Sequence, residues 1–244
     1  RRGLEKGKLL FELHGHKLKG RWTLVRTRRR GGSDNEWLLI KKPDGYSQSE
    51  RDARTPDVSV LSGLAVEDLP LRAQRLQALR AELAEFPPAP HARPRLTLAR
   101  KGDVLVDRPG WLYELKYDGY RMTLTKRGDA IELRYRSGLD VTERFPELAH
   151  AATRLPFEEG VMDGELVALT DDAKPTFQRL QQRVQVCRPA DVARIAQVIP
   201  VTYYAFDLLT CEGRDLRGAR LRDRKRWLMD LVPKLGTIRF ADHV

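Results

Sequence analysis

A strictly alternating run ahead of an Asp-Gly turn places the strongest constraint on how this chain can fold. In residues 111–116, large apolar side chains alternate with a face that ends in Glu114 and Lys116. Asp118-Gly119 is a strong turn signal, because glycine accepts positive φ and aspartate can bond its own backbone. A second alternating run follows in residues 120–125. The pattern predicts a β-hairpin that carries Lys116 at the end of its first strand.

Lys116 in this position has two interpretations. A free lysine ammonium has a pKa near ~10.4 and is a poor nucleophile at neutral pH. Desolvation or a neighbouring cation would lower that pKa and free the amine to attack a carbonyl or phosphoryl centre. Most lysines at strand ends keep their charge in water, however, and a Lys-x-Asp-Gly match alone is a weak signal. The lysine is therefore a candidate nucleophile that needs support from other motifs.

Charge and composition limit the partners. The 244 residues carry a formal net charge of +11, with 41% hydrophobic and 32% charged residues, which is typical of a folded globular protein. The positive excess favours a polyanionic partner, nucleic acid before an anionic membrane surface. No apolar run approaches the ~20 residues of a membrane span, so no membrane partner is expected. Cys187 and Cys211 lack the spacing of a metal site or a disulfide framework, which favours a reducing, cytoplasmic setting.

The first part of the chain is expected to be a small β-rich piece. Alternation predicts strands in residues 9–13, 22–24 and 37–40. The basic run at residues 28–30 suits phosphate and solvent equally. His14 and His16 flank a turn without a third ligand at sensible spacing, so we interpret them as surface residues. This piece, residues 1–46, is too short to bury a good core alone.

A proline-rich stretch at residues 87–90 divides the chain. Residues 47–70 are polar without sustained periodicity and are interpreted as a linker. Apolar residues recur at helical spacing in residues 71–86, which predicts a helix that the prolines end. Residues 47–90 are therefore expected to be linker and helix, and a second domain is expected to occupy residues 91–244.

The second domain is expected to have an α+β fold, with antiparallel sheets flanked by helices. Apolar and alternating runs predict strands in residues 131–135, 161–169 and 201–209. Helical periodicity predicts helices in residues 145–155, 176–187, 190–198 and 217–232. The helices at 176–187 and 217–232 each have a basic side that faces either DNA or solvent.

Three residues beyond the turn have unusual surroundings. Glu165 lies inside an apolar run, where a carboxylate costs free energy unless it meets a cation, a metal or a donor. An edge strand in solvent is the alternative for Glu165. Phe206 suits stacking on a base, although an aromatic in a strand is more often part of a core. Arg136 ends a predicted strand near a loop, where it would meet phosphate or water.

Four motifs occur together in one order: Lys116-Tyr117-Asp118-Gly119-Tyr120-Arg121, Arg136-Ser137-Gly138-Leu139-Asp140, Asp163-Gly164-Glu165 and Tyr204-Ala205-Phe206-Asp207-Leu208-Leu209. In this order and spacing they resemble the covalent nucleotidyltransferase superfamily of ATP-dependent DNA ligases and mRNA capping enzymes. The closer resemblance is to the ligase module of bacterial ligase D, the multifunctional enzyme of non-homologous end joining. Ser137 stands where this family usually has asparagine.

The resemblance also implies how the chain is divided. Residues 18–22 and 37–41 look like the tail of the 3′-phosphoesterase domain that can precede the ligase in this subfamily. Residues 1–46 would thus be the C-terminal remnant of a β-rich phosphoesterase domain. Residues 91–244 would be a ligase adenylation domain that is incomplete at its C-terminal end.

The resemblance implies roles for residues in and beside the first two motifs. Lys116 would attack the α-phosphate of ATP, release pyrophosphate and hold AMP as a phosphoramidate. Glu114 would face the adenine amino group, and Arg121 the ribose. Arg136 would contact ribose or a DNA phosphate, and Asp118 would orient the site.

The remaining motifs complete the implied site. Glu165 would bind ribose or help to hold a divalent metal, Mg²⁺ or Mn²⁺, and Phe206 would stack on adenine. The metal and basic side chains suit the chemistry, because the leaving pyrophosphate is highly anionic. AMP would next pass to a 5′-phosphate, and a 3′-hydroxyl would displace it to seal the break.

The implied partners are double-stranded DNA ends or nicks, with a DNA-end-binding repair protein, near the bacterial nucleoid. Both ends of the chain look cut, because it begins without Met and stops at Val244 before the family's later lysine motifs and oligonucleotide-binding domain. We therefore expect a fragment with impaired or absent activity. The alternatives are an RNA ligase or capping guanylyltransferase, and a non-catalytic, basic DNA-binding remnant.

Overall fold

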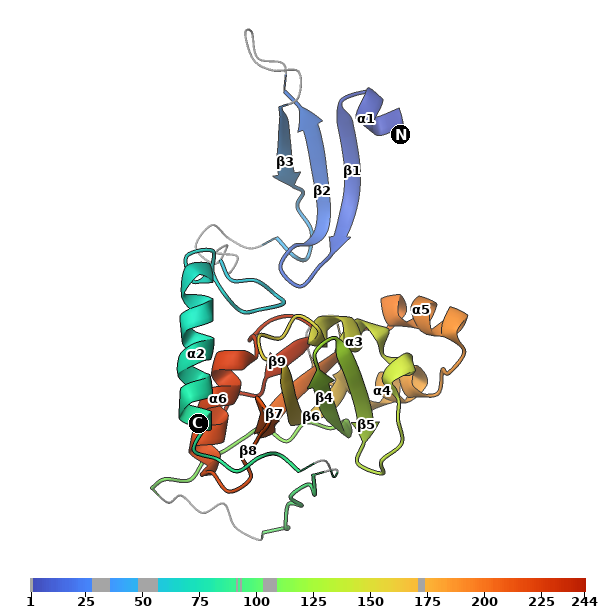
Figure 1. Ribbon diagram of the computed structural model, residues 1–244. Coiled ribbons are helices and arrows are strands. Elements are labelled where there is room, and N and C mark those ends of the chain that lie inside the picture. The colour runs from blue at the N-terminus through green and yellow to red at the C-terminus, as the bar shows by residue number, and fades with distance from the viewer. Residues whose placement is uncertain are drawn as a thin grey trace. The chain divides into compact units, whose positions relative to one another are not determined.

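A computed structural model describes residues 2–27, 36–47, 57–90, 92, 94–102, 109–170 and 174–244 (Figure 1). The chain splits into two compact units, residues 1–57 and 58–244. The division falls before residues 58–90 and not after them, so the helix of that stretch belongs to the larger unit. The basic run at residues 28–30 lies outside the described residues.

The smaller unit is a three-stranded antiparallel sheet. After the short helix α1 (Arg2–Glu5), strands β1 (Lys8–His14), β2 (Lys19–Arg26) and β3 (Trp37–Lys41) lie in that order. The three strands expected here are confirmed, and the side chains of β1 alternate between exposed and half-buried. Leu10, Leu38 and Ile40 remain exposed, because a sheet of this size buries little apolar surface. His14 and His16 are exposed, as expected of surface residues.

The larger unit is built on a six-stranded mixed sheet. Its path runs in the order β5 (Ala130–Tyr135), β4 (Tyr120–Arg127), β6 (Glu159–Ala168), β7 (Val201–Cys211) and β8 (Arg214–Asp215), with antiparallel neighbours. Strand β9 (Ile238–Phe240) pairs with β7 in parallel. The three strands predicted here are confirmed. Strand β6 is central, so Glu165 does not lie on an edge strand.

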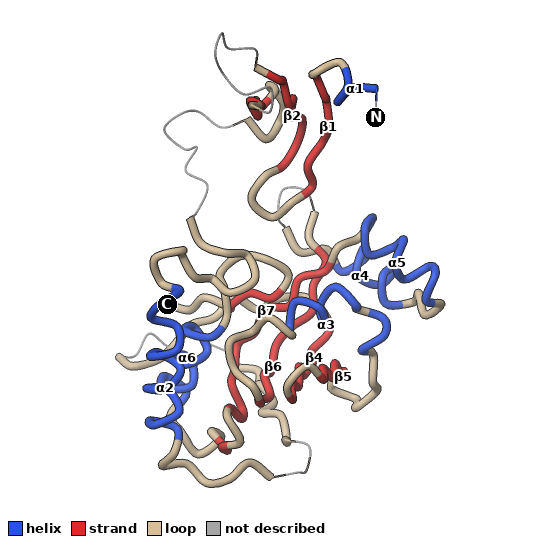
Figure 2. Tube along the Cα trace, turned by 45° about the horizontal axis from the view of Figure 1, so that its top comes forward, coloured by secondary structure: helices blue, strands red, loops and turns tan. Residues whose placement is uncertain are grey.

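Helices α2 (Arg72–Leu83) and α6 (Leu221–Leu231) lie side by side in both views (Figures 1 and 2). The other helices are α3 (Pro146–Ala152), α4 (Phe177–Val184) and α5 (Pro189–Val198), with the 3-10 turns η1 (Leu69–Leu71) and η2 (Thr142–Arg144). The expected helices are present, but most are shorter than the periodicity predicts. Helix α6 begins late because Asp215 accepts the Arg217 N–H and Leu216 accepts the Ala219 N–H in a preceding turn. None of the described helices has the length and apolarity that a membrane crossing requires.

One face of the large sheet forms the core. Met122, Leu124, Met162 and Tyr203 are fully buried on it, and burial of such a side chain stabilises by about 1.5–3 kcal/mol. The Tyr203 hydroxyl lies 3.1 Å from the Met122 carbonyl oxygen and 3.2 Å from that of Met162, so its donor has a partner. The opposite face carries threonines and charged residues, and we call it the polar face.

A β-bulge interrupts the pairing of β6 and β7. The register pairs Ala205 with Gly164 and Asp207 with Asp163, which leaves Phe206 as an extra residue. Ala205 is buried, whereas Phe206 and Asp207 are both only partly buried. The bulge therefore places two successive side chains on the polar face. A second shift of the same kind lies further along β7.

The predicted hairpin over residues 111–125 is wrong. Strand β4 pairs with β5 and β6, whereas residues 111–118, which we call the Lys116 segment, form no strand. Tyr113 and Val244 exchange backbone hydrogen bonds of 2.9 and 3.0 Å, and Glu114 forms an isolated bridge with His243. The turn after Lys116 leads the chain into β4 instead of back along itself.

Candidate functional site

The polar face carries a tight ion pair between β4 and β6. Arg121 donates from Nη2 to Asp163 Oδ2 at 2.7 Å and from Nε to Oδ1 at 3.1 Å. The Asp163 side chain is 2% exposed and that of Arg121 is 19% exposed. Burial raises the pKa of Asp163, while the hydrogen bonds to Asp163 raise the pKa of Arg121. Pairing at two points holds the guanidinium plane in one orientation.

Arg121 also contacts the ring expected to stack on a base. Its Cζ lies 5.6 Å from the centroid of the Phe206 ring, within the range of a cation–π contact. The bulge in β7 holds this ring on the polar face. Two of the predicted site residues are therefore neighbours, although they lie far apart in the sequence.

Glu165 is the next residue of this group. It is directly opposite Arg121 in the ladder between β4 and β6. Burial raises the pKa of Glu165, and a backbone hydrogen bond from Gly119 and the charges of Lys116 and Arg121 partly oppose that rise. The Lys-x-Asp-Gly motif and the Asp-Gly-Glu motif thus meet at this carboxylate.

Lys116 itself is exposed. Within the described part of the chain its ammonium forms no ion pair, although its charge lowers the pKa of Glu165. This exposed position is one of the two surroundings that the sequence allows for Lys116. Asp118 and Arg136 are exposed as well, and the Arg136 N–H donates to the Arg121 carbonyl oxygen at 3.0 Å.

Tyr117, the residue after Lys116, is held by ring stacking. The sequence patterns did not indicate this contact. The rings of Tyr117 and Tyr204 are stacked, with centroids 4.1 Å apart and planes 15° apart. Tyr204 is opposite Glu165 in the ladder. Arg239 also contacts Tyr204, with its Cζ 5.9 Å from the centroid of the Tyr204 ring. Burial raises the pKa of Tyr117.

Glu114 is paired with a lysine of α6. Its Oε1 accepts a hydrogen bond from Lys225 Nζ. The Lys225 side chain is 1% exposed, so the basic side predicted for this helix does not place Lys225 against DNA or solvent. The basic side predicted for α4 is wrong in the same way at Arg183, which is fully buried and paired with Glu147 at 2.9 Å. A pattern of basic residues on a helix does not reveal which of them are buried.

The carboxylates on the polar face are the candidate metal ligands. Among the described residues, no three His, Cys, Asp or Glu side chains are grouped closely enough to hold a metal ion. Asp163 is occupied by Arg121, and Asp207 by Arg224 at 2.7 and 3.0 Å. Among the described residues, Glu165 is the carboxylate of this strand pair that forms no ion pair. Because Mg²⁺ is often held by one or two carboxylates together with substrate phosphates, this donor set fits a metal that arrives with a nucleotide.

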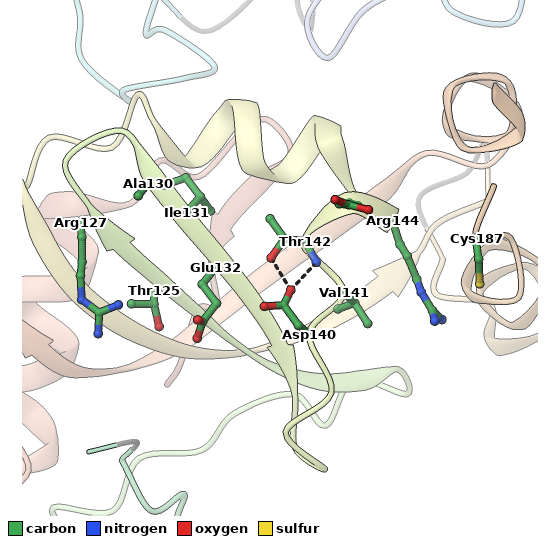
Figure 3. A pocket seen from close by; sticks show the side chains of 11 residues that line it. Thr125, Arg127, Ala130, Ile131, Glu132, Asp140, Val141, Thr142, Arg144 and Cys187 are labelled. Atoms are coloured by element: carbon green, nitrogen blue, oxygen red, sulfur yellow. Dashed lines mark hydrogen bonds between the residues drawn. The ribbon is translucent and has the colours of Figure 1, made fainter. Parts of the chain in front are cut away.

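A hollow of about 740 Å³ lies along β5 and η2 (Figure 3). None of the predicted site residues lines it. Its Asp140 accepts hydrogen bonds from the N–H and the hydroxyl of Thr142, at 3.0 and 2.7 Å, and its Arg144 donates to the Val184 carbonyl oxygen at 3.2 Å. These groups are used by the fold, and the polar face remains the candidate site.

Several known proteins are similar to this chain. Residues 91–244 match the ATP dependent DNA ligase domain. The multifunctional non-homologous end joining protein LigD of Pseudomonas aeruginosa is 36% identical over 95% of this chain and 27% of its own length. The LigD protein of Mycobacterium tuberculosis is 28% identical over 93% of this chain and 23% of its own length. The chain thus spans about a quarter of the length of these curated relatives.

Two solved structures are similar in part. The ligase domain of M. tuberculosis LigD gives a TM-score of 0.42 at 31% identity, over 55% of this chain and 39% of that chain. A mycobacterial DNA ligase D complexed with ATP and MES gives 0.41 at 29% identity, over 54% and 39%. The match to the ATP dependent DNA ligase domain family, over residues 91–244, covers more than half of the sequence. The chain therefore belongs to the family of ATP-dependent DNA ligase domains, and within it to the LigD type.

Proposed function

We propose that this chain is an adenylation module in which Lys116 becomes covalently linked to AMP. The observation that carries the proposal is the meeting of separate motifs on the polar face. Arg121 is opposite Glu165 and lies over the Phe206 ring, and the charge of Lys116 acts on Glu165. A nucleophile, a free carboxylate, a fixed guanidinium and an aromatic ring are the groups that binding and attack of a nucleotide require.

The reaction is a nucleophilic displacement at phosphorus. The neutral Lys116 amine attacks the α-phosphorus of ATP. A nitrogen–phosphorus bond forms, the bond from the α-phosphorus to the bridging oxygen breaks, and pyrophosphate leaves while the nitrogen loses its proton to solvent. An oxygen of a DNA 5′-phosphate then attacks the same phosphorus, the nitrogen–phosphorus bond breaks, and the lysine nitrogen takes a proton from solvent to become the amine again. A 3′-hydroxyl finally attacks the 5′-phosphate and loses its proton, a phosphodiester bond forms, and AMP leaves.

The other residues hold the nucleotide. Phe206 stacks on the adenine and Glu114 accepts from its amino group. Arg121 and Arg136 contact the ribose or phosphates, and Glu165 binds the ribose or, together with the phosphates, a divalent ion. Mg²⁺ or Mn²⁺ would neutralise the charge that develops on the leaving pyrophosphate.

The biological setting follows from the relatives and from the charge. The formal net charge of +11 supports DNA ends or nicks as the substrate, because a basic chain is attracted to a polyanion. End joining near the nucleoid, with a DNA-end-binding protein, is the process we propose. Residues 1–46 are proposed as the last part of a 3′-phosphoesterase domain, and residues 91–244 as the adenylation domain.

Incubation with ATP labelled at the α-phosphate, in the presence of Mg²⁺, tests the proposal. The chain is expected to acquire covalent label, and Lys116→Ala to lose it. Lys42→Ala, which removes an exposed lysine of the smaller unit, is the matched control and keeps the label. Label retained in Lys116→Ala would place the nucleophile elsewhere.

Two further outcomes decide between the alternatives. Preferential transfer of GMP from labelled GTP would favour a capping guanylyltransferase. Salt-sensitive DNA binding without any covalent nucleotide would favour a non-catalytic binding module.

A further inference from the structure

The Lys116 segment needs an anchor that the sheet does not provide. Residues 111–118 lie outside the strand ladder. Among the described residues, their backbone pairs at one antiparallel bridge, Glu114 with His243, which the two hydrogen bonds between Tyr113 and Val244 form. A reactive group works only when its neighbours are held to within about 0.5 Å. Side chains from other elements must therefore fix the position of Glu114 and Lys116.

Lys225 is such an anchor. It reaches Glu114 from α6, with its own side chain 1% exposed and its Nζ 5.7 Å from the centroid of the Phe240 ring. An ammonium so far removed from water needs a partner, because an unpaired buried charge is strongly unfavourable. Glu114 is the carboxylate that pairs with it. Each group therefore restricts where the other can lie.

Helix α6 also holds the strand that carries the aromatic ring. Arg224, the residue before Lys225, donates to both oxygens of Asp207 at 2.7 and 3.0 Å, and Asp207 follows Phe206. Two consecutive residues of one helix thus hold the proposed base-stacking strand and the proposed base-reading carboxylate. The contacts of α6 therefore connect the residue next to Phe206 with Glu114.

We propose that Lys225 is a positioning residue that acts through Glu114 and sets the preference for adenine over guanine. This inference rests on the proposed function. Lys225 occupies Oε1 of Glu114 and leaves Oε2 to accept a hydrogen bond from the amino group of adenine. A carboxylate accepts hydrogen bonds, which the amino group of adenine donates. Guanine presents a carbonyl oxygen at the same edge, and an ionised carboxylate repels it.

A double-mutant cycle with neutral replacements tests the pairing. The variants are Lys225→Met, Glu114→Gln and the combination, and the measurements are the rate and KM of label transfer from ATP and the ratio of ATP to GTP use. Lys225→Met is expected to lower the ATP-to-GTP ratio by about tenfold, which is the scale of one hydrogen bond. Glu114→Gln is expected to do the same, and the combination to be no worse than Glu114→Gln alone.

Arg226→Met is the matched control. It breaks the ion pair of the next residue of α6 with Glu82, which lies on α2 and away from the Lys116 segment. The ATP-to-GTP ratio is expected to stay unchanged in this variant, although the protein loses an ion pair on the same helix. Lys225→Arg, which retains the charge, is expected to retain the adenine preference.

The outcomes that overturn the inference are distinct from failure of the proposed function. An unchanged ratio in folded Lys225→Met, or effects that multiply in the combination, would remove the role of Lys225 and leave Lys116 labelling intact. If Lys225→Met does not fold, the combination carries the test, because it has no unpaired buried charge, and activity far below Glu114→Gln would contradict the inference. Absence of label in the unmodified chain would remove the proposed function, and this inference with it.

Discussion

The strands β4, β6 and β7 and the Lys116 segment hold their functional residues in different ways. In the strands, backbone ladders set the positions, and the buried pair of Arg121 with Asp163 adds to them. In the segment, individual side-chain contacts do this work, such as Glu114 with Lys225 and the Tyr117 ring on Tyr204. Damage to the strands should therefore appear as lost stability, and damage to the segment as lost chemistry.

The largest effect is expected from Asp163→Ala, which removes the buried carboxylate that pairs with the partly buried Arg121. Removing one member of a buried pair costs about 3–5 kcal/mol of unfolding free energy, measured by urea denaturation. Asp215→Ala is the control, because Arg217 pairs with Asp215 at two points in the same way but is more exposed. A loss of about 1 kcal/mol or less is expected there. Equal losses in the two variants would break the distinction between buried and exposed pairs.

Gly164→Ala comes next, because β6 approaches β7 closely at this residue. An added methyl group would meet the Tyr203 ring and the Tyr204 carbonyl oxygen. Overpacking of this kind costs about 1–3 kcal/mol. Gly218→Ala, with open space around the added methyl, is the control and should change stability by less than about 0.5 kcal/mol. A neutral Gly164→Ala would mean that the strands can move apart at the site.

Tyr117→Leu tests the segment. Losing an aromatic pair costs about 0.5–1.5 kcal/mol, so the melting temperature should fall only slightly while labelling at Lys116 slows. Tyr204→Leu removes the same stack from the strand side and should slow labelling to a similar extent. A large fall in stability with unchanged labelling in Tyr117→Leu would show that the segment is part of the structural core and does not serve the chemistry.

Glu165→Gln is expected to have the smallest effect on stability. It should raise stability at neutral pH, whereas the other variants lower it. Burial raises the folded-state pKa of Glu165 above its unfolded value, so the folded protein holds this proton more tightly. The stability that results is present below the unfolded pKa, about 4.3, and is lost as the pH rises through the folded pKa. Relative to Glu165→Gln, the unmodified chain should therefore lose stability between pH 4 and pH 7, as urea titrations at both values would measure. The opposite trend would mean that the carboxylate is stabilised in its charged form.

Most elements of the larger unit follow from the sequence, because periodicity reports which side chains face a core. Residues 161–169 and 201–209 are strands for that reason. The alternation of residues 111–116 has no such cause, because Trp111 and Leu115 are exposed and these residues form one isolated bridge without a strand ladder. Period alone cannot distinguish such a segment from a strand.

The residues of the candidate site are also predictable only in part. The order of the motifs indicated that Arg121, Glu165 and Phe206 belong together, and the fold makes them neighbours. The pairings of Asp163 with Arg121 and of Lys225 with Glu114 join distant parts of the chain. The apolar run around Asp163 indicates that its carboxylate needs a partner but not which one, and one sequence holds no signal for the pairing of Lys225.

The bulge at Phe206 makes this ring an addition to the ladder. Ala205 pairs with Gly164 and Asp207 with Asp163, so a deletion of Phe206 would restore regular alternation, with Asp207 still on the polar face and Leu208 still inward. The strand would keep its inner and outer side chains and lose the ring that contacts Arg121. Deletion of a paired residue of β7 would instead exchange the two faces over the rest of the strand.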